Sequence, residues 1–259
     1  MIEKKYLAPN AITASNMLLG YLSIVSSIDG DYVKSVWFII AAMVCDTLDG
    51  KTARKFDAFS EFGKEFDSFC DAISFGLAPG VLILSILKET PIAKYMIPIS
   101  FIYALCGVMR LVKFNIVTTA SSEKDDFSGM PIPCAAALVV GYYLLCHTAV
   151  NSNIFGGVNL FSPELFSIIS IVAAVLMVSL VPFKTPDKVF AFIPKKMFPF
   201  FLIAVLVTLK YSLFIFAAYY VLVNLGDYFM RKGVLGPKYT ISNEDEDNDE
   251  NEENKEELK

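Results

Sequence analysis

Long apolar stretches separated by short polar segments make up most of this chain. The first stretch opens at Pro9 and ends near Ile28, and the turn residues Asp29, Gly30 and Asp31 follow it. Further stretches lie at about residues 33–49, 67–87, 95–112, 133–150 and 165–181. Stretches of this length and apolarity are typical of membrane-spanning helices. Asn10 or Thr13 fits the N-cap of the first helix, and Pro79 should kink the third.

The last apolar block, residues 197–229, is too long for one upright span. Lys210 divides it, so we predict two short helices, with one long tilted helix as the alternative. The pattern therefore predicts an all-α transmembrane bundle of about eight spans with both termini on one side of the membrane. Neither an inverted repeat nor a soluble second domain is visible.

Basic residues are distributed unequally between the two sides of this bundle. The loops on one side carry only four of them: Lys34, Lys88, Lys94 and Lys210. Most of the remaining Lys and Arg residues of the apolar body fall on the side of the termini. Because cytoplasmic loops are enriched in basic residues, we expect both termini on the cytoplasmic side of the cell membrane.

The composition is typical of a membrane protein, except in the C-terminal residues, which are acidic and poor in apolar residues. The chain is 55% hydrophobic, with a mean hydropathy of +0.53, which is too apolar for an ordinary soluble domain. The net charge of −5 arises in the tail, because residues 244–259 hold ten acids and two lysines. We expect a membrane domain at residues 1–242 and a disordered acidic tail at residues 243–259.

Several common kinds of site are not indicated. The five cysteines contain no C-x2-C pair, which argues against a zinc site or a disulfide framework. His147 is the single histidine and lies in an apolar stretch, so neither a Ser-His-Asp hydrolase nor a histidine-rich metal site is expected. No nucleic-acid partner is expected.

Carboxylates and small residues recur at helical spacing on both sides of a short polar segment. The first set lies on one helix face: Asp46, Asp49, Gly50 and Ala53. The second set also shares a face: Gly63, Asp67 and Asp71. Residues 55–62 are long enough for a turn, so the two faces can oppose each other at the edge of the apolar core.

Four carboxylates so placed cannot all remain ionised without cations. Two of them about 4 Å apart repel by roughly 4 kcal/mol at an effective dielectric constant near 20. Oxygen-rich sites suit Mg²⁺ or Mn²⁺, and two such ions would roughly cancel the charge. The small residues at positions 50, 53 and 63 leave room for a ligand, and Arg54 supplies a cation for phosphate.

The spacing D-x2-D-G-x2-A-R-x8-G-x3-D-x3-D resembles the signature of the CDP-alcohol phosphatidyltransferase family at every fixed position. These membrane enzymes displace CMP from a CDP-linked lipid with an alcohol. The resemblance implies that Asp46, Asp49 and Asp67 bind metal. It implies that Asp71 is both the ligand nearest the acceptor and the general base. The remaining residues implied in nucleotide binding are Asn10, Thr13, Gly50, Ala53, Arg54 and Gly63.

Secondary motifs are similar to one branch of this family, the bacterial and archaeal phosphatidylserine synthases. They are residues 74–79 (SFGLAP), 110–115 (RLVKFN) and 129–133 (GMPIP). The resemblance implies CDP-diacylglycerol or CDP-archaeol as donor, L-serine as acceptor, membrane lipid around the protein and, as is common in the family, a homodimer. No Ser/His or Cys/His pair is available for a covalent intermediate, which favours direct displacement.

Three further cations remain for a phosphate or for the carboxylate of serine. Arg110 is favoured for such a role because a second cation, Lys113, follows on the same helix end. Lys113 stands where the branch more often has Arg, which keeps the charge but loses the bidentate fork. For Lys113 and Lys184, an interfacial cation that aids orientation is an equal alternative.

Two other functions fit parts of the pattern. The metal motif does not specify the alcohol, so glycerol phosphate or inositol phosphate could replace serine. The acidic cluster could also line a cation pathway in a transporter, but that predicts inverted repeats and broken midplane helices. The acids here form one cluster near the ends of spans, which favours the enzyme.

Overall fold

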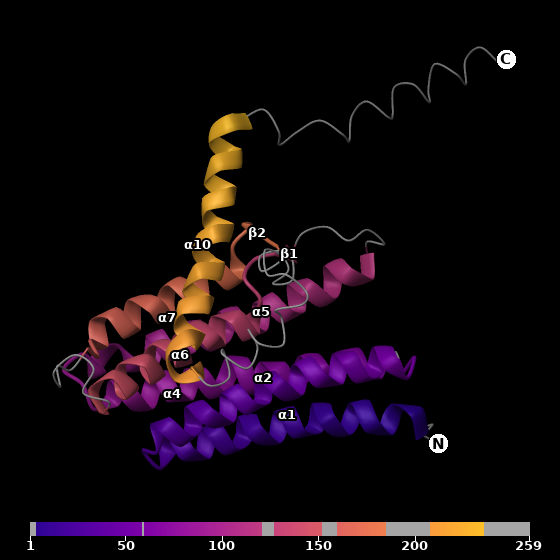
Figure 1. Ribbon diagram of the computed structural model, residues 1–259, viewed down its shortest axis with the longest axis horizontal. Helices are drawn as coiled ribbons and strands as arrows, with labels where there is room; N and C mark the ends of the chain where they lie inside the picture. Colours follow the sequence, from indigo (N-terminus) through magenta and orange to yellow (C-terminus); the bar gives the residue numbers. More distant parts are fainter. Residues whose placement is uncertain (1–3, 59, 121–126, 152–159, 185–207, 236–259) are drawn as a thin grey trace.

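A computed structural model describes residues 4–58, 60–120, 127–151, 160–184 and 208–235, which are almost entirely helical (Figure 1). The helices are α1 (Lys4–Ile28), α2 (Tyr32–Lys55), α3 (Glu61–Asp71), α4 (Ala78–Lys88), α5 (Met96–Ala120), α6 (Ile132–Asn151), α7 (Pro163–Val178) and α10 (Leu209–Leu235). A π-helical turn, Ala72–Leu77, joins α3 to α4, and a 3-10 turn, Ala93–Tyr95, precedes α5. Strands β1 (Phe127–Ser128) and β2 (Pro182–Phe183) form a short antiparallel pair, with Phe127 opposite Phe183.

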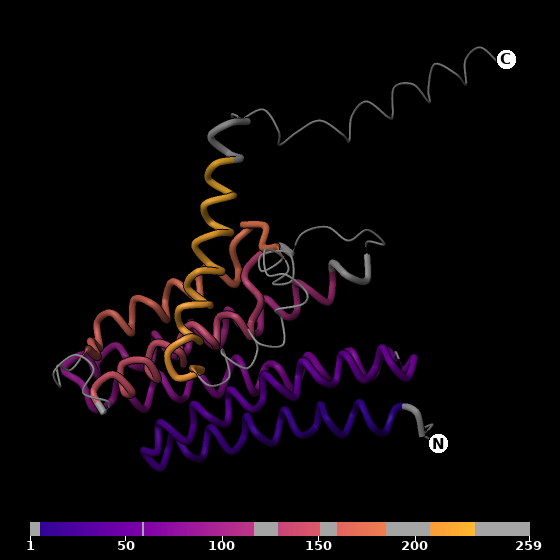
Figure 2. The backbone as a smooth tube through the Cα atoms, in the orientation of Figure 1, coloured from indigo at the N-terminus to yellow at the C-terminus, as the bar shows by residue number. Residues whose placement is uncertain are grey.

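Helices α1 and α2 form an antiparallel hairpin and lie side by side along most of their lengths (Figure 2). The predicted turn connects them, with Gly30 at a φ of 81°, where a residue without Cβ is favoured. The side chain of Asp31 caps α2 by accepting a hydrogen bond from the Lys34 amide. Near this turn, the Ser35 hydroxyl lies 2.8 Å from that of Ser23 and 2.7 Å from that of Ser27. The hairpin therefore fixes how α1 lies against the acidic end of α2.

The first helix starts earlier than the apolar pattern indicates. It begins at Lys4, so Asn10 and Thr13 lie inside α1, and the expectation that one of them caps it is wrong. Pro9 is tolerated because it removes only one intrahelical hydrogen bond close to the helix start. The side chains of Asn10 and Thr13 therefore do not cap α1, and both line a cavity between α1, α2 and α3.

Pro79 distorts the third predicted span in a specific way. Residues Glu61–Lys88 form one continuous helical segment in which a π-helical turn ends two residues before the proline. The Ala78 amide donates to the Ile73 carbonyl, five residues earlier. Because Pro79 has no N–H, the Phe75 carbonyl loses its usual partner, and the buried Tyr103 hydroxyl donates to it instead at 3.2 Å. The distortion therefore follows directly after Asp71.

A single close contact sets the distance between α1 and this π-helical turn. A Cβ placed on Gly20 would lie 2.4 Å from Ser74 Oγ and 2.8 Å from Ser74 Cα. Only glycine allows the two backbones to approach this closely. The Ser74 hydroxyl donates to the Asn16 carbonyl across the same contact at 2.9 Å. The middle of α1 is thereby held against the end of α3.

Five helical segments of the described chain are long and apolar enough to cross a membrane. They are Tyr6–Ile28, Glu61–Lys88, Ala93–Ile116, Ile132–Val150 and Leu209–Met230. Helix α2 carries Lys34, Asp46 and Asp49 and is not among them, and α7 is shorter, with 16 residues. Lys210 lies at the start of one continuous helix, α10, while residues 197–207 of the predicted last block lie outside the described residues.

Helix α10 runs at a steep angle to the α1–α2 hairpin and packs mainly on α6 (Figure 1). A Cβ on Gly141 of α6 would lie 2.8 Å from the Phe214 amide nitrogen, so this crossing also depends on a glycine. The main core lies between α4, α5, α6 and α7, with Leu82, Tyr103 and Phe166 among its fully buried side chains. The acidic ends of α2 and α3 lie at one end of this packed unit.

Candidate active site

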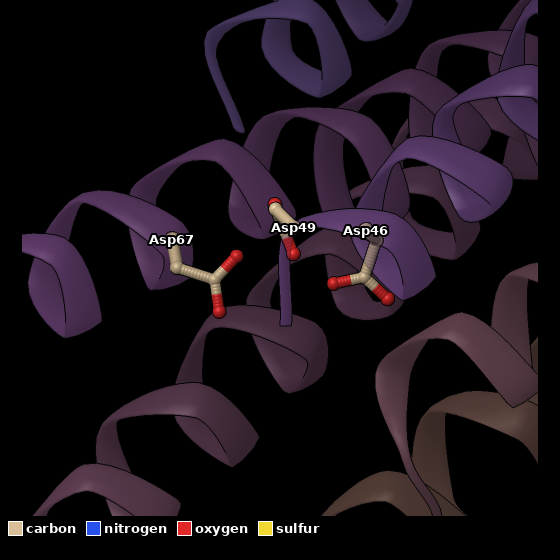
Figure 3. Close-up of side chains that lie close together, drawn as sticks. All are labelled: Asp46, Asp49 and Asp67. Atoms are coloured by element: carbon tan, nitrogen blue, oxygen red, sulfur yellow. The ribbon is translucent and has the colours of Figure 1, made fainter. Parts of the chain in front are cut away.

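Three carboxylates from two helices meet near the end of the α1–α2 hairpin that is opposite its turn (Figure 3). Asp46 and Asp49 lie one turn apart on α2, and Asp67 faces them from α3. One ligand oxygen from each lies within 4.8 Å of the others. The two predicted acidic faces therefore oppose each other.

Two oxygens of this group are buried without a hydrogen-bond partner among the described residues, namely Asp49 Oδ2 and Asp67 Oδ1. Buried polar groups are nearly always paired, and a buried carboxylate oxygen without a donor is especially costly. No lysine or arginine forms an ion pair with the group within the described residues. An oxygen-only, electron-rich cluster of this kind fits a hard divalent cation such as Mg²⁺ or Mn²⁺.

The connection between α2 and α3 brings the two acidic faces together. Helix α2 ends at Lys55, and the Ala58 amide then donates to the Ala53 carbonyl at 2.9 Å. Asp57 adopts a φ of 47°, which reverses the chain. Ser60 caps α3 by accepting a hydrogen bond from the Gly63 amide at 2.9 Å. The turn predicted for residues 55–62 is confirmed.

A cavity of about 220 Å³ opens beside the carboxylates. Its lining residues come from α1, α2, α3 and the α2–α3 connection: Pro9, Asn10, Thr13, Asp49, Gly50, Ala53, Ala58, Ser60, Gly63, Lys64 and Asp67. Five of these are the residues that the resemblance assigns to the nucleotide. Arg54, the sixth, is exposed, and its Nη2 atom would lie 3.9 Å from a Cβ on Gly50.

The small residues of the motif keep this cavity open. A Cβ on Gly63 would lie 3.0 Å from Ser60 Oγ and 3.7 Å from Asn10 Oδ1. Ser60 and Lys64, which the sequence analysis did not single out, also line the cavity. The signal for Ser60 was available, because a serine three residues before Gly63 at the start of a helix is typical of an N-cap.

Asp71 stands apart from the group of three. It is the last residue of α3, is 8% exposed, and accepts a hydrogen bond from Asn16 Nδ2 of α1 at 3.1 Å. It is close enough to Asp46 and Asp67 to interact with them electrostatically. The four predicted carboxylates are therefore gathered at one place, with three in a tight group and Asp71 beside them.

Arg110 approaches this place from α5. It is 9% exposed, and its guanidinium carbon lies 5.1 Å from the centre of the Phe114 ring. It interacts electrostatically with Asp71. Two residues after the half-buried Lys113, Asn115 donates to the Ser68 hydroxyl at 3.0 Å. The end of α5 is thereby tied to the helix that carries Asp67 and Asp71.

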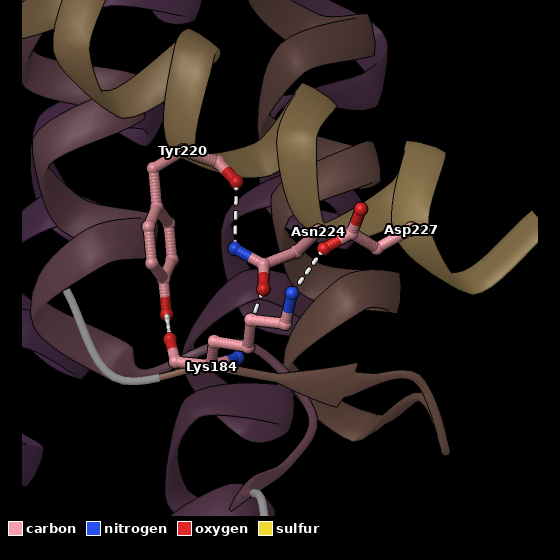
Figure 4. A network of polar contacts seen from close by, with 4 residues as sticks. All are labelled: Lys184, Tyr220, Asn224 and Asp227. Carbon is pink, nitrogen blue, oxygen red and sulfur yellow. Dashed lines mark hydrogen bonds and ion pairs between the residues drawn. The ribbon is translucent and has the colours of Figure 1, made fainter. Parts of the chain in front are cut away.

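Lys184 lies directly after β2 and is tied to α10 (Figure 4). Its ammonium group forms an ion pair with Asp227, and its amide donates to Asn224 Oδ1 at 2.8 Å. The Tyr220 hydroxyl donates to the Lys184 carbonyl, also at 2.8 Å. Sequence reasoning missed these partners, although Tyr220, Asn224 and Asp227 have helical spacing and share one face.

The fold and the site together define a helical membrane protein with a group of three carboxylates beside a cavity. A profile of the CDP-alcohol phosphatidyltransferase family matches residues 6–181, so the chain belongs to this family. The resemblance recognised in the sequence is thereby confirmed.

Curated relatives share a large part of this chain. The chain is 37% identical over 188 residues to the CDP-diacylglycerol–serine O-phosphatidyltransferase of Helicobacter pylori, which covers 73% of this chain and 76% of the relative. It is 39% identical over 137 residues to the enzyme of the same name from Bacillus subtilis, covering 51% and 72%. It is 38% identical over 139 residues to the archaetidylserine synthase of Methanothermobacter thermautotrophicus, covering 52% and 57%.

Proposed function

We propose that this protein transfers the phosphatidyl group of CDP-diacylglycerol, or the corresponding group of CDP-archaeol, to L-serine and releases CMP. The observation that carries the proposal is the group of three carboxylates, with two buried unpaired oxygens, on the wall of a cavity. The names of the relatives support serine as the acceptor.

Asp46, Asp49 and Asp67 would hold divalent cations, Mg²⁺ or Mn²⁺ and two in number. Bound there, the cations would neutralise the pyrophosphate and the charge that develops on the phosphoryl group and on the departing CMP. Asn10, Thr13, Gly50, Ala53, Arg54 and Gly63 would receive the nucleotide. Five of them line the cavity, and Arg54 lies beside Gly50.

Asp71 would act as the general base and complete the ligand set next to the acceptor. It takes the proton of the serine hydroxyl while the hydroxyl oxygen forms a bond to the lipid-side phosphorus. The bond from that phosphorus to the bridging oxygen breaks, and CMP leaves with the electron pair. Arg110, which interacts electrostatically with Asp71, and Lys113 would hold the carboxylate of serine.

We also propose eight spans: the five apolar segments, α2, α7, and an eighth that the sequence predicts from residues 197–209, most of which lie outside the described residues. Helix α2 can cross because its long contact with α1 shields the polar residues on the shared face. The bias of basic loops supports a location of both termini and the active site on the cytoplasmic side of the cell membrane. Residues 1–242 would form the membrane domain and residues 243–259 an acidic tail, and the family resemblance adds a homodimer.

The test is CMP release by purified protein in detergent, supplied with CDP-diacylglycerol and Mg²⁺ or Mn²⁺. We expect release that depends on L-serine and stops when EDTA is added, because the carboxylate group needs a cation to bind the pyrophosphate. Parallel reactions contain glycerol 3-phosphate or inositol phosphate in place of serine. Release with one of these alone would reject serine, and silence with both CDP-diacylglycerol and CDP-archaeol would reject the enzyme.

We predict that Lys184 does not belong to the substrate site. Because its ammonium group is paired with Asp227, we expect Lys184→Met to leave the KM values for serine and CDP-lipid unchanged. Both side chains are about 30% exposed, so the free energy of unfolding should fall by about 1 kcal/mol or less. Steady-state kinetics and thermal melting in detergent measure the two effects.

The matched control is Asp227→Asn, which breaks the same ion pair from the other side. If the pair only ties β2 to α10, the two variants behave alike. A higher KM in Lys184→Met but not in Asp227→Asn would instead assign Lys184 to an anionic substrate.

A further inference from the structure

Asn16 joins the first helix to the proposed general base. It is fully buried on α1, and its Nδ2 atom donates to Asp71 Oδ1 at 3.1 Å, across 55 positions of sequence. It lies outside the family signature, and the sequence analysis did not select it. No other hydrogen bond between described side chains reaches Asp71.

The amide is buried at a cost that the fold alone does not require. Asn16 Oδ1 has no hydrogen-bond partner among the described residues, so half of the side chain is unsatisfied. An apolar residue at this buried position would avoid burying polar atoms. The contact between α1 and the π-helical turn is made by other atoms, because the Ser74 hydroxyl donates to the main-chain carbonyl of Asn16.

The orientation of the amide is fixed by Asp71. Reversing the amide would turn Oδ1 towards a carboxylate oxygen and place two acceptors in contact. With Nδ2 on Asp71 Oδ1, the carboxylate cannot rotate freely, and Oδ2 has no hydrogen bond among the described residues. Oδ2 is therefore the oxygen left to receive a proton.

We propose that Asn16 is a positioning residue that holds the Asp71 carboxylate with Oδ2 turned towards the acceptor hydroxyl. The inference rests on the proposed function, in which Asp71 is the base. Because Asn16 is fully buried, its role is exerted through Asp71 and not by contact with a substrate. Residues that orient such a group typically contribute about 10–100-fold to activity.

The experiment compares Asn16→Leu and Asn16→Asp with the control Ser74→Ala in the full-length protein. Leucine removes the donor while keeping the same number of side-chain heavy atoms, and aspartate keeps the shape but replaces the donor by an acceptor. Ser74→Ala removes the other tertiary hydrogen bond of Asn16 and leaves Asp71 untouched. The measurements are kcat and KM for serine-dependent CMP release, CDP-diacylglycerol binding without serine, and the melting temperature in detergent.

We expect kcat to fall by about 10–100-fold in both Asn16 variants, with binding of CDP-diacylglycerol unchanged and kcat near wild type in Ser74→Ala. A wild-type kcat in either folded Asn16 variant would overturn the proposal. So would equal losses of activity and melting temperature in Asn16→Leu and Ser74→Ala, which indicate a structural role only. Absence of serine-dependent release in the unaltered protein would reject the proposed function instead.

Discussion

Asp71→Asn is expected to lower kcat for serine-dependent CMP release by about 10²–10⁴-fold, the usual contribution of a general base. Asparagine has the shape of aspartate but cannot take the proton of the serine hydroxyl. Asn16 Nδ2 can still donate to the amide oxygen of the new side chain, so the contact between α1 and α3 survives. The effect therefore falls on the chemical step, which pre-steady-state or saturating steady-state assays measure.

Binding separates this role from a role in holding the nucleotide. The group of three carboxylates remains intact in the variant, so affinity for CDP-diacylglycerol with Mn²⁺ should remain close to that of the unaltered protein. Turnover near wild type would remove Asp71 as the base. A parallel loss of CDP-lipid binding would show that Asp71 acts mainly as a cation ligand and not mainly as the base.

Asp67→Asn is expected to change activity and stability in opposite directions. In the absence of metal, Asp67 adds a third carboxylate within 4.8 Å of two others and buries one unpaired oxygen. Removing its charge relieves repulsion of roughly 4 kcal/mol per close pair at an effective dielectric constant near 20. In EDTA, the variant should therefore melt at a higher temperature than the unaltered protein.

The same substitution should abolish metal-dependent turnover and most of the stabilisation by added Mn²⁺. A bound ligand at about 100 times its Kd stabilises a folded protein by about 2.7 kcal/mol, so the metal-induced shift in melting temperature is measurable. The control is Glu61→Gln, which removes an exposed carboxylate from the first turn of the same helix. Equal metal shifts in the Asp67 variant and the unaltered protein would contradict a cation site at these residues.

These opposite effects describe a compromise between stability and function. The carboxylates are costly in the folded protein without metal, and the packing of α2 and α3 against α1 keeps them near one another. A cation and the pyrophosphate of a CDP-lipid supply the missing charge. The protein should therefore be most stable with both metal and nucleotide bound.

Local spacing in the sequence was sufficient to predict the two acidic helix faces. Asp46 and Asp49 share a face because a helix repeats every 3.6 residues, and no distant contact can alter that. The turn between the two helices followed from a short polar segment between apolar ones. The start of α1 could not be predicted in the same way, because charged residues 4 and 5 continue the helix without contributing to the apolar pattern.

The sequence by itself determined the helical class, the two carboxylate faces and the family, because each depends on residues close together in the chain. The tertiary structure decided which distant side chains complete the site. Asn16 reaches Asp71 only because Gly20 lets α1 approach the π-helical turn, and Lys184 is tied to Asp227 because β2 lies beside α10. Such contacts depend on how helices pack, and helix packing is set by small residues and shape complementarity that leave no periodic signal in the chain.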